Sequence, residues 1–173
     1  MRRLADLERI QHFMRRLGDE TDQQVRLYFT GGASAVLIGW RSTTIDVDIR
    51  IVPETDRLLR AIVRFKDELQ INIELVSPTD FIPELPGWEG RSQYIGSEGQ
   101  MTFYHYDFYA QALSKIERGH SQDIQDVRAM IERSLISVQS LRCHFDQMKP
   151  FLYRYPAIDP PSFQKALEEI LKS

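Results

Sequence analysis

A chain of 173 residues with 42% hydrophobic and 27% charged residues has the composition of a globular protein and fits one domain spanning residues 1–173. No apolar run approaches the ~20 residues that cross a bilayer, so we expect no membrane-spanning segment and no membrane partner. A net charge of −3 argues against broad nucleic-acid binding, which depends on clustered Lys and Arg.

The first predicted element is an amphipathic helix within residues 1–20. Apolar side chains recur at helical spacing from Leu4 to Leu17, and Gly18 stands where a helix C-cap would lie. This start has basic residues but neither a continuous apolar segment nor a small-residue cleavage site, so a helix is favoured over a signal peptide. We therefore expect a cytoplasmic protein.

Between residues 25 and 76 the pattern predicts alternating strands and helices. The run VRLYF, residues 25–29, has the β-branched and aromatic content of a buried strand, and Gly31 and Gly32 follow it. The segment ASAVLIGW, residues 33–40, is short and apolar. It is predicted to form one or two buried helical turns whose N-terminus follows the double glycine.

Residues 44–52 alternate strictly between two kinds of side chain and are predicted to form a strand. Its two faces would carry Ile45, Val47 and Ile49 on one side and Thr44, Asp46 and Asp48 on the other. Such alternation is also typical of a half-exposed edge strand. By itself it predicts only that the two aspartates point the same way.

A helix and another strand follow. Residues 55–69 are predicted to be helical because apolar residues recur there at helical spacing. These are Leu58, Leu59, Ile62, Val63 and Leu69. Residues 71–76 are predicted to form a strand with Ile71, Ile73 and Leu75 inward and Asn72 and Glu74 opposite. Consecutive strand and helix units favour a mixed sheet with helices packed against it.

The rest of the chain is predicted to be a long loop followed by helices. Residues 77–99 are rich in Pro and Gly, and a short hairpin is expected from SQYIG and MTFYHY. Residues 104–173 are predicted to be mainly helical. The expected helix boundaries are Gly119, a cap at Ser121 or Asp123, and a cap at Asp159. The predicted class is α+β, a mixed sheet flanked by helices with additional C-terminal helices.

Two carboxylates on one strand face point to a cation. Asp46 and Asp48 lie one residue apart, and two anions held that close repel each other unless a cation or solvent separates them. Mg²⁺ is commonly held by one or two carboxylates plus substrate phosphates. Glu74, on the polar face of the later strand, would complete a three-carboxylate set for two metal ions, although alone it is also typical of a solvated face.

The double glycine suits a phosphate. Gly31 and Gly32 lack Cβ atoms and let a phosphate approach the backbone, where the following helix offers free N–H groups. The hydroxyl of Ser34 would add a donor. The segment is neither a Walker A loop nor a dinucleotide fingerprint, and most glycine pairs are ordinary turns. The phosphate interpretation therefore depends on the aspartates downstream.

Together the stretch GGASAVLIGWRSTTIDVDI, residues 31–49, resembles the signature of the DNA polymerase β-type nucleotidyltransferase superfamily. The similarity is to its small prokaryotic branch, which includes minimal nucleotidyltransferases and the toxins of toxin–antitoxin pairs. The resemblance implies that fold, with residues 25–76 as the catalytic core. It also implies roles for individual residues: Gly31, Gly32 and Ser34 in the nucleotide-phosphate turn, Arg41 as the basic residue after it, and Asp46 and Asp48 as the metal pair.

A second stretch, ALSKIERGHSQDIQDVRAMI, is similar to a helical segment of the same branch. There Lys115 would face the nucleotide phosphates, while Arg118, Asp123 and Asp126 would shape the site or its walls. Without the resemblance these charges would be ordinary helix-face residues and caps. The sequence departs from the branch at the third carboxylate, where Glu74 stands in place of the common Asp.

The leading hypothesis is an Mg²⁺-dependent nucleotidyltransferase that moves a nucleoside monophosphate from a nucleoside triphosphate to a hydroxyl acceptor. The acceptor is a protein side chain, an RNA 3′ end or a small molecule, and the sequence does not choose among them. A toxin-like member would have a cognate antitoxin protein as a partner. The alternative is a noncatalytic nucleotide-binding or protein-interaction domain that retains the fold.

Overall fold

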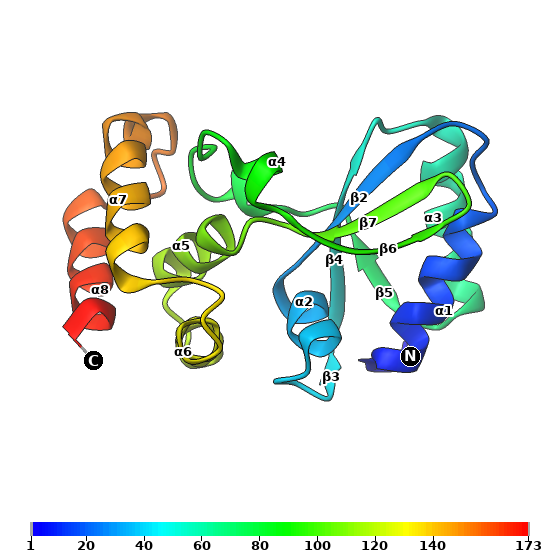
Figure 1. Ribbon diagram of the computed structural model, residues 1–173, viewed down its shortest axis with the longest axis horizontal. Coiled ribbons are helices and arrows are strands. Elements are labelled where there is room, and N and C mark those ends of the chain that lie inside the picture. Colours follow the sequence, from blue (N-terminus) through cyan, green and yellow to red (C-terminus); the bar gives the residue numbers. More distant parts are fainter. Residues whose placement is uncertain (1, 173) are drawn as a thin grey trace. The chain divides into compact units, whose positions relative to one another are not determined.

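A computed structural model describes residues 2–172, which form two compact units (Figure 1). The sheet unit comprises the residues up to Ser77 together with Ser92–Tyr106. The helical unit comprises Pro78–Arg91 together with the residues from Asp107 onward. The single domain expected from chain length stays a prediction. Among the described helices, none is both long enough and apolar enough to cross a membrane.

The sheet unit is built on a mixed sheet. Within residues 2–172, five strands lie in the order β5-β4-β2-β7-β6. Their bounds are Val25–Thr30 for β2, Asp46–Val52 for β4, Asn72–Glu74 for β5, Gln93–Glu98 for β6 and Met101–His105 for β7. Strand β2 is antiparallel to β4 and parallel to β7, β4 is parallel to β5, and β6 is antiparallel to β7. This confirms the predicted fold class and the β6–β7 hairpin.

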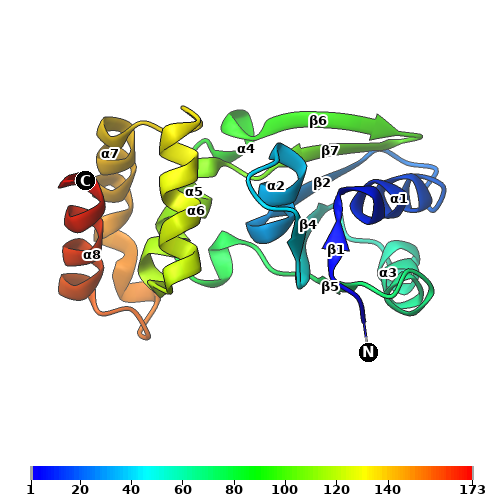
Figure 2. The same ribbon diagram turned by 90° about the horizontal axis from the view of Figure 1, so that it is seen from below.

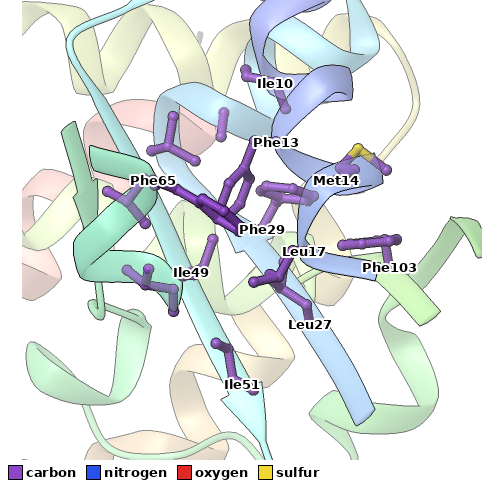
Figure 3. Packing of buried hydrophobic residues seen from close by; sticks show 14 of the residues in the cluster. Ile10, Phe13, Met14, Leu17, Leu27, Phe29, Ile49, Ile51, Phe65 and Phe103 are labelled. Carbon is purple, nitrogen blue, oxygen red and sulfur yellow. The ribbon is translucent and has the colours of Figure 1, made fainter. Parts of the chain in front are cut away.

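One face of this sheet carries the hydrophobic core. Apolar residues at alternate strand positions meet helices α1 (Leu7–Gly18) and α3 (Asp56–Glu68), as Figure 3 shows. Phe13 of α1 and Phe65 of α3 are fully buried, with ring centroids 6.4 Å apart in an edge-to-face arrangement. Because strand side chains alternate, burying this face turns the polar side chains of β4 and β5 to the other face.

The start of the chain differs from the prediction. Helix α1 begins at Leu7 instead of near Leu4, because the Asp6 side chain caps it by accepting a hydrogen bond from the Arg9 backbone at 2.9 Å. Residues Ala5–Asp6 form strand β1, which pairs with β3 (Thr43–Thr44). The predicted C-cap is also wrong, since Gly18 is the last helical residue and Asp19 is the cap.

The strand predicted over residues 44–52 begins later. Thr44 belongs to β3, and β4 starts at Asp46, so Ile45 lies between the strands and is 72% exposed. Two other residues expected inward are exposed as well. Val63 falls outside the buried stripe of α3, and Leu75 follows the end of β5.

The helical unit matches the prediction of a mainly helical C-terminal part. Its elements are a 3₁₀ turn at Pro78–Asp80, α4 (Trp88–Arg91), α5 (Phe108–Arg118), α6 (Ser121–Glu132), α7 (Val138–Met148), a 3₁₀ segment at Lys149–Arg154 and α8 (Pro160–Lys172). Helix α5 ends with Gly119 as its C-cap, as expected. The expected cap of α6 is wrong: His120 holds the N-cap position, and Asp123 instead accepts a hydrogen bond from Arg118 at 2.6 Å.

We expect Phe65→Ala to lower the free energy of unfolding by about 3–5 kcal/mol, because it leaves a cavity in a close-packed core. Val63→Ala on the same helix, at a position 65% exposed, should change it by less than about 0.5 kcal/mol. Urea denaturation of both variants measures the difference. Equal losses would contradict the assignment of the buried face of α3.

Candidate active site

The candidate site lies at the end of the sheet where β4 and β5 begin and β2 ends. Asp46 pairs with Asn72, and Asp48 pairs with Glu74, in the parallel register of β4 and β5. Residues that pair directly across neighbouring strands project to the same face. The register therefore brings Asp46, Asp48 and Glu74 to one face, opposite the hydrophobic core.

Asn72 joins the carboxylates. Its side-chain amide nitrogen donates to Oδ1 of Asp46 at 2.5 Å and to Oε1 of Glu74 at 3.0 Å. Its amide oxygen accepts from Nη1 of Arg2 at 2.9 Å. The sequence pattern placed Asn72 on the same face as Glu74 but assigned it no function. An amide two residues before a candidate carboxylate on a strand is the signal that could have identified it.

The double glycine is required by close packing at the start of α2 (Gly31–Ile38). Gly31 has a φ of +61°, and a Cβ there would lie 3.3 Å from Oδ2 of Asp48. A Cβ at Gly32 would overlap the Thr44 side chain and lie 2.9 Å from Nη1 of Arg41. The turn therefore lies directly beside Asp48 and Arg41. The helix begins at Gly31, two residues earlier than expected.

Nothing on the Thr30 side chain blocks the helix N-terminus. Thr30 is the N-cap of α2 and forms no side-chain cap hydrogen bond. The first N–H groups of a helix and the positive end of its dipole favour an anion. The start of α2, beside Asp48, is therefore the kind of position that favours an anion.

The hydroxyl of Ser34 has partners within the sheet unit. It is fully buried, and its hydroxyl donates to the Phe29 backbone oxygen at 3.1 Å and lies 3.0 Å from Nδ1 of His105. A serine hydroxyl has one hydrogen, and Ser34 donates it to the Phe29 oxygen. Nδ1 of His105 is therefore the donor in its hydrogen bond with Ser34. These bonds tie α2 to the ends of β2 and β7, and the donor role toward phosphate predicted for Ser34 stays a prediction.

The second predicted group belongs to the helical unit. The ammonium of Lys115, which is 3% exposed, lies 2.8 Å from Oδ2 of Asp126 and 3.6 Å from Oδ1 of Asp123. Arg118 pairs with Asp123 at 2.6 Å. These four residues form one ion-pair cluster between α5 and α6, in which Lys115, Asp123 and Asp126 are buried and Arg118 is exposed. The predicted contact of Lys115 with nucleotide phosphates stays a prediction.

The carboxylates suit a hard cation. In the part of the chain that the structure describes, no three Asp, Glu, His or Cys side chains converge to hold a metal ion by themselves. Mg²⁺ needs only one or two carboxylates when substrate phosphates and water complete its shell. Asp46 and Asp48 supply such a pair beside the glycine turn. Their oxygen donors fit Mg²⁺, while metal binding by Glu74 stays a prediction.

Comparison with models of protein families matches residues 5–168 to the family described as nucleotidyltransferase of unknown function (DUF6036). The match covers nearly all of the 173 residues, so the chain belongs to this family. No curated protein and no solved structure is found to match the chain.

The buried imidazole of His105, beside Ser34, should make the stability of the folded protein depend on pH. Burial lowers the pKa of His105 from 6.5 to about 4, so the unfolded chain takes up this proton before the folded chain does. Stability should therefore fall as pH drops from 6.5 toward about 4. Between about pH 7.5 and about pH 4.5, His105 should account for roughly 2–3 kcal/mol of the decrease in the free energy of unfolding. Urea denaturation of wild type and His105→Gln at both pH values measures this share.

The matched control is His12→Gln, because His12 is exposed. This variant should keep the full pH dependence of the wild type. An equal pH dependence in His105→Gln would contradict the assignment.

The Lys115 cluster makes a separate prediction. Lys115→Met leaves Asp126 buried without its ammonium partner and should cost about 3–5 kcal/mol of unfolding free energy. Lys165→Met, on the exposed face of α8, should cost less than about 0.5 kcal/mol. Chemical denaturation compares the two. A loss as small as that of the control would refute the structural role of the Lys115 ion pair.

Proposed function

We propose that this member of the family transfers a nucleoside monophosphate from a nucleoside triphosphate to a hydroxyl acceptor with Mg²⁺, as a DNA polymerase β-type nucleotidyltransferase. The observation that carries the proposal is the β4–β5 register, with Asp46 beside Asn72 and Asp48 beside Glu74. The same face meets the glycine turn at Asp48. A phosphate turn and a carboxylate cluster are thus adjacent, as transfer from a triphosphate requires.

The metal would be held by Asp46 and Asp48. When bound, Mg²⁺ neutralises charge on the triphosphate and on the departing pyrophosphate. The two aspartates stand on a central strand, hydrogen-bonded on one side to β2 and on the other to β5. A rigid strand keeps both carboxylates at a fixed spacing, which a metal–nucleotide complex needs.

The glycine turn and Arg41 would hold the phosphates. The start of α2 offers backbone N–H groups, and the absence of side chains at Gly31 and Gly32 lets an anion approach them. The Arg41 guanidinium packs against Gly32, so its positive charge lies beside the same turn. Arginine donors match the geometry of phosphate oxygens. These groups orient the triphosphate.

Glu74 would accept the proton of the attacking hydroxyl. It lies next to Asp48 across the strand pair, and Asn72 holds its Oε1 by a hydrogen bond. In the transfer, the acceptor oxygen forms a bond to the α-phosphorus, and the bond from that phosphorus to the bridging oxygen breaks. Pyrophosphate leaves, and the proton passes to Glu74 and then to solvent.

A toxin-like role with a cognate antitoxin remains part of the proposal.

The test is thermal stabilisation by each nucleoside triphosphate with and without Mg²⁺. A triphosphate at a hundredfold its dissociation constant should add about 2.7 kcal/mol to the unfolding free energy of the wild type. Asp46→Asn/Asp48→Asn should lose the Mg²⁺-dependent part of the shift, because it removes both anionic oxygen donors. Asp22→Asn, at an exposed position in the same unit, should keep it.

Label transfer from each α-labelled triphosphate to a cell extract completes the test. We expect label in the extract with wild type and none with the double variant. An undiminished thermal shift in the double variant would overturn the metal assignment. A shift in wild type without any transfer would instead favour a noncatalytic nucleotide-binding domain.

A further inference from the structure

A cavity of about 500 Å³ lies at the start of β5 and shares Asn72 with the carboxylate cluster. It is lined by Arg2, Arg3, Leu4, Ile45, Asp67, Gln70 and Asn72. The backbone N–H of Arg3 donates to the Gln70 backbone oxygen at 2.6 Å, which fixes the N-terminal segment beside the start of β5 (Figure 2). A cavity of this size accommodates a ligand of about one nucleotide.

Asn72 belongs to both the cavity and the carboxylate cluster. Its amide nitrogen holds Asp46 and Glu74, and its amide oxygen accepts from Arg2 in the cavity wall. One side chain therefore separates the cavity from the carboxylates. Asn72 thus links a ligand in the cavity to the carboxylate of Glu74.

The cavity wall carries two arginines, one aspartate and apolar side chains. Arg2 contacts Asn72 and, at 3.4 Å, Asp67, whereas the Arg3 guanidinium bonds to none of the described residues. Ile45, immediately before Asp46, is 72% exposed at this wall. Two guanidinium groups suit a phosphate, and an exposed aliphatic side chain suits the face of a sugar or base.

The strand order places the cavity opposite the glycine turn. The turn follows β2, on one side of β4, while Asn72 and the cavity lie with β5 on the other side. Transfer of a phosphoryl group requires the attacking and leaving oxygens to be roughly in line across the phosphorus. With the triphosphate on the turn, the acceptor must approach from the β5 side, where the cavity lies.

We propose that this cavity is the acceptor subsite, and that Arg2 and Arg3 select an acceptor with a phosphate near its reacting hydroxyl, as at the 3′ end of a nucleotide. The inference rests on the proposed function and names the substrate class of the same site. The acceptor hydroxyl forms the bond to the α-phosphorus and gives its proton to Glu74, and pyrophosphate is released. A site for one terminal nucleotide is compatible with a net charge of −3.

The test measures binding of a fluorescent hexaribonucleotide with a free 3′-hydroxyl, by anisotropy at low salt. Arg3→Glu should weaken binding by about tenfold or more, since it reverses a phosphate-facing charge. Arg60→Glu, an exposed arginine on α3, is the matched control and should bind as the wild type does. Wild type without binding, or Arg3→Glu binding equally well, overturns the subsite.

A competition experiment distinguishes the two possible acceptors, a free nucleotide and the end of an RNA chain. A nucleoside monophosphate that displaces the hexaribonucleotide at similar concentration indicates a free nucleotide acceptor. Failure to displace it, with binding still lost in Arg3→Glu, indicates the end of an RNA chain. Both outcomes support a phosphate-recognising subsite.

Two further readouts keep this inference distinct from the proposed function. Arg3→Glu should retain the Mg²⁺-dependent thermal shift with triphosphate, because the glycine turn and Asp46 and Asp48 are unchanged, while label transfer falls by about tenfold or more. Hexaribonucleotide binding without label transfer in wild type would refute the proposed function and, with it, the acceptor role of the cavity. Transfer to protein alone, without hexaribonucleotide binding, would refute the subsite and support the proposed function.

Discussion

The parallel register of β4 and β5, which puts three carboxylates on one sheet face, is the constraint on which the candidate site depends. Asp46, Asp48 and Glu74 share that face because β4 and β5 are parallel and in register. Anions this close raise the energy of the folded state unless donors or cations offset them. The Asn72 amide donates to two of them, and Arg2 in turn donates to Asn72. A bound cation would offset the repulsion further.

The hydrophobic core on the opposite face holds this arrangement in place. Phe13 and Phe65 pack against alternate strand residues, and a register slip of one residue would move the aspartates into that core. The cost of burying charge therefore protects the geometry of the site. The strand order then separates the glycine turn, beside β2, from the cavity at the start of β5. In the proposed reaction, one sheet would thus provide a donor side and an acceptor side.

Two of the predicted site residues, Ser34 and Lys115, already have partners within the protein. The Ser34 hydroxyl donates to the Phe29 backbone oxygen and accepts from His105, so it links α2 to β2 and β7. The Lys115 ammonium is bonded to Asp126 inside the helical unit. A sequence pattern shows which polar and charged side chains are present. It does not show which of them are hydrogen-bonded or ion-paired to each other in the folded protein. The opposite holds for Asn72 and Arg2, to which the sequence pattern assigned no role. Hydrogen bonds between segments far apart in the chain bring both of them to the candidate site.

Local pattern in the sequence determined the strands, the turn and the alternation that sets Asp46 and Asp48 on one face, since these depend on neighbouring residues. The family resemblance added the nucleotidyltransferase interpretation, which the family match supports. Sequence alone could not predict the start of β4 or the exposure of Ile45, because pairing between β1 and β3 decides them. Only the tertiary structure placed Glu74 beside Asp48, since strand order and register arise from packing between segments far apart in the chain.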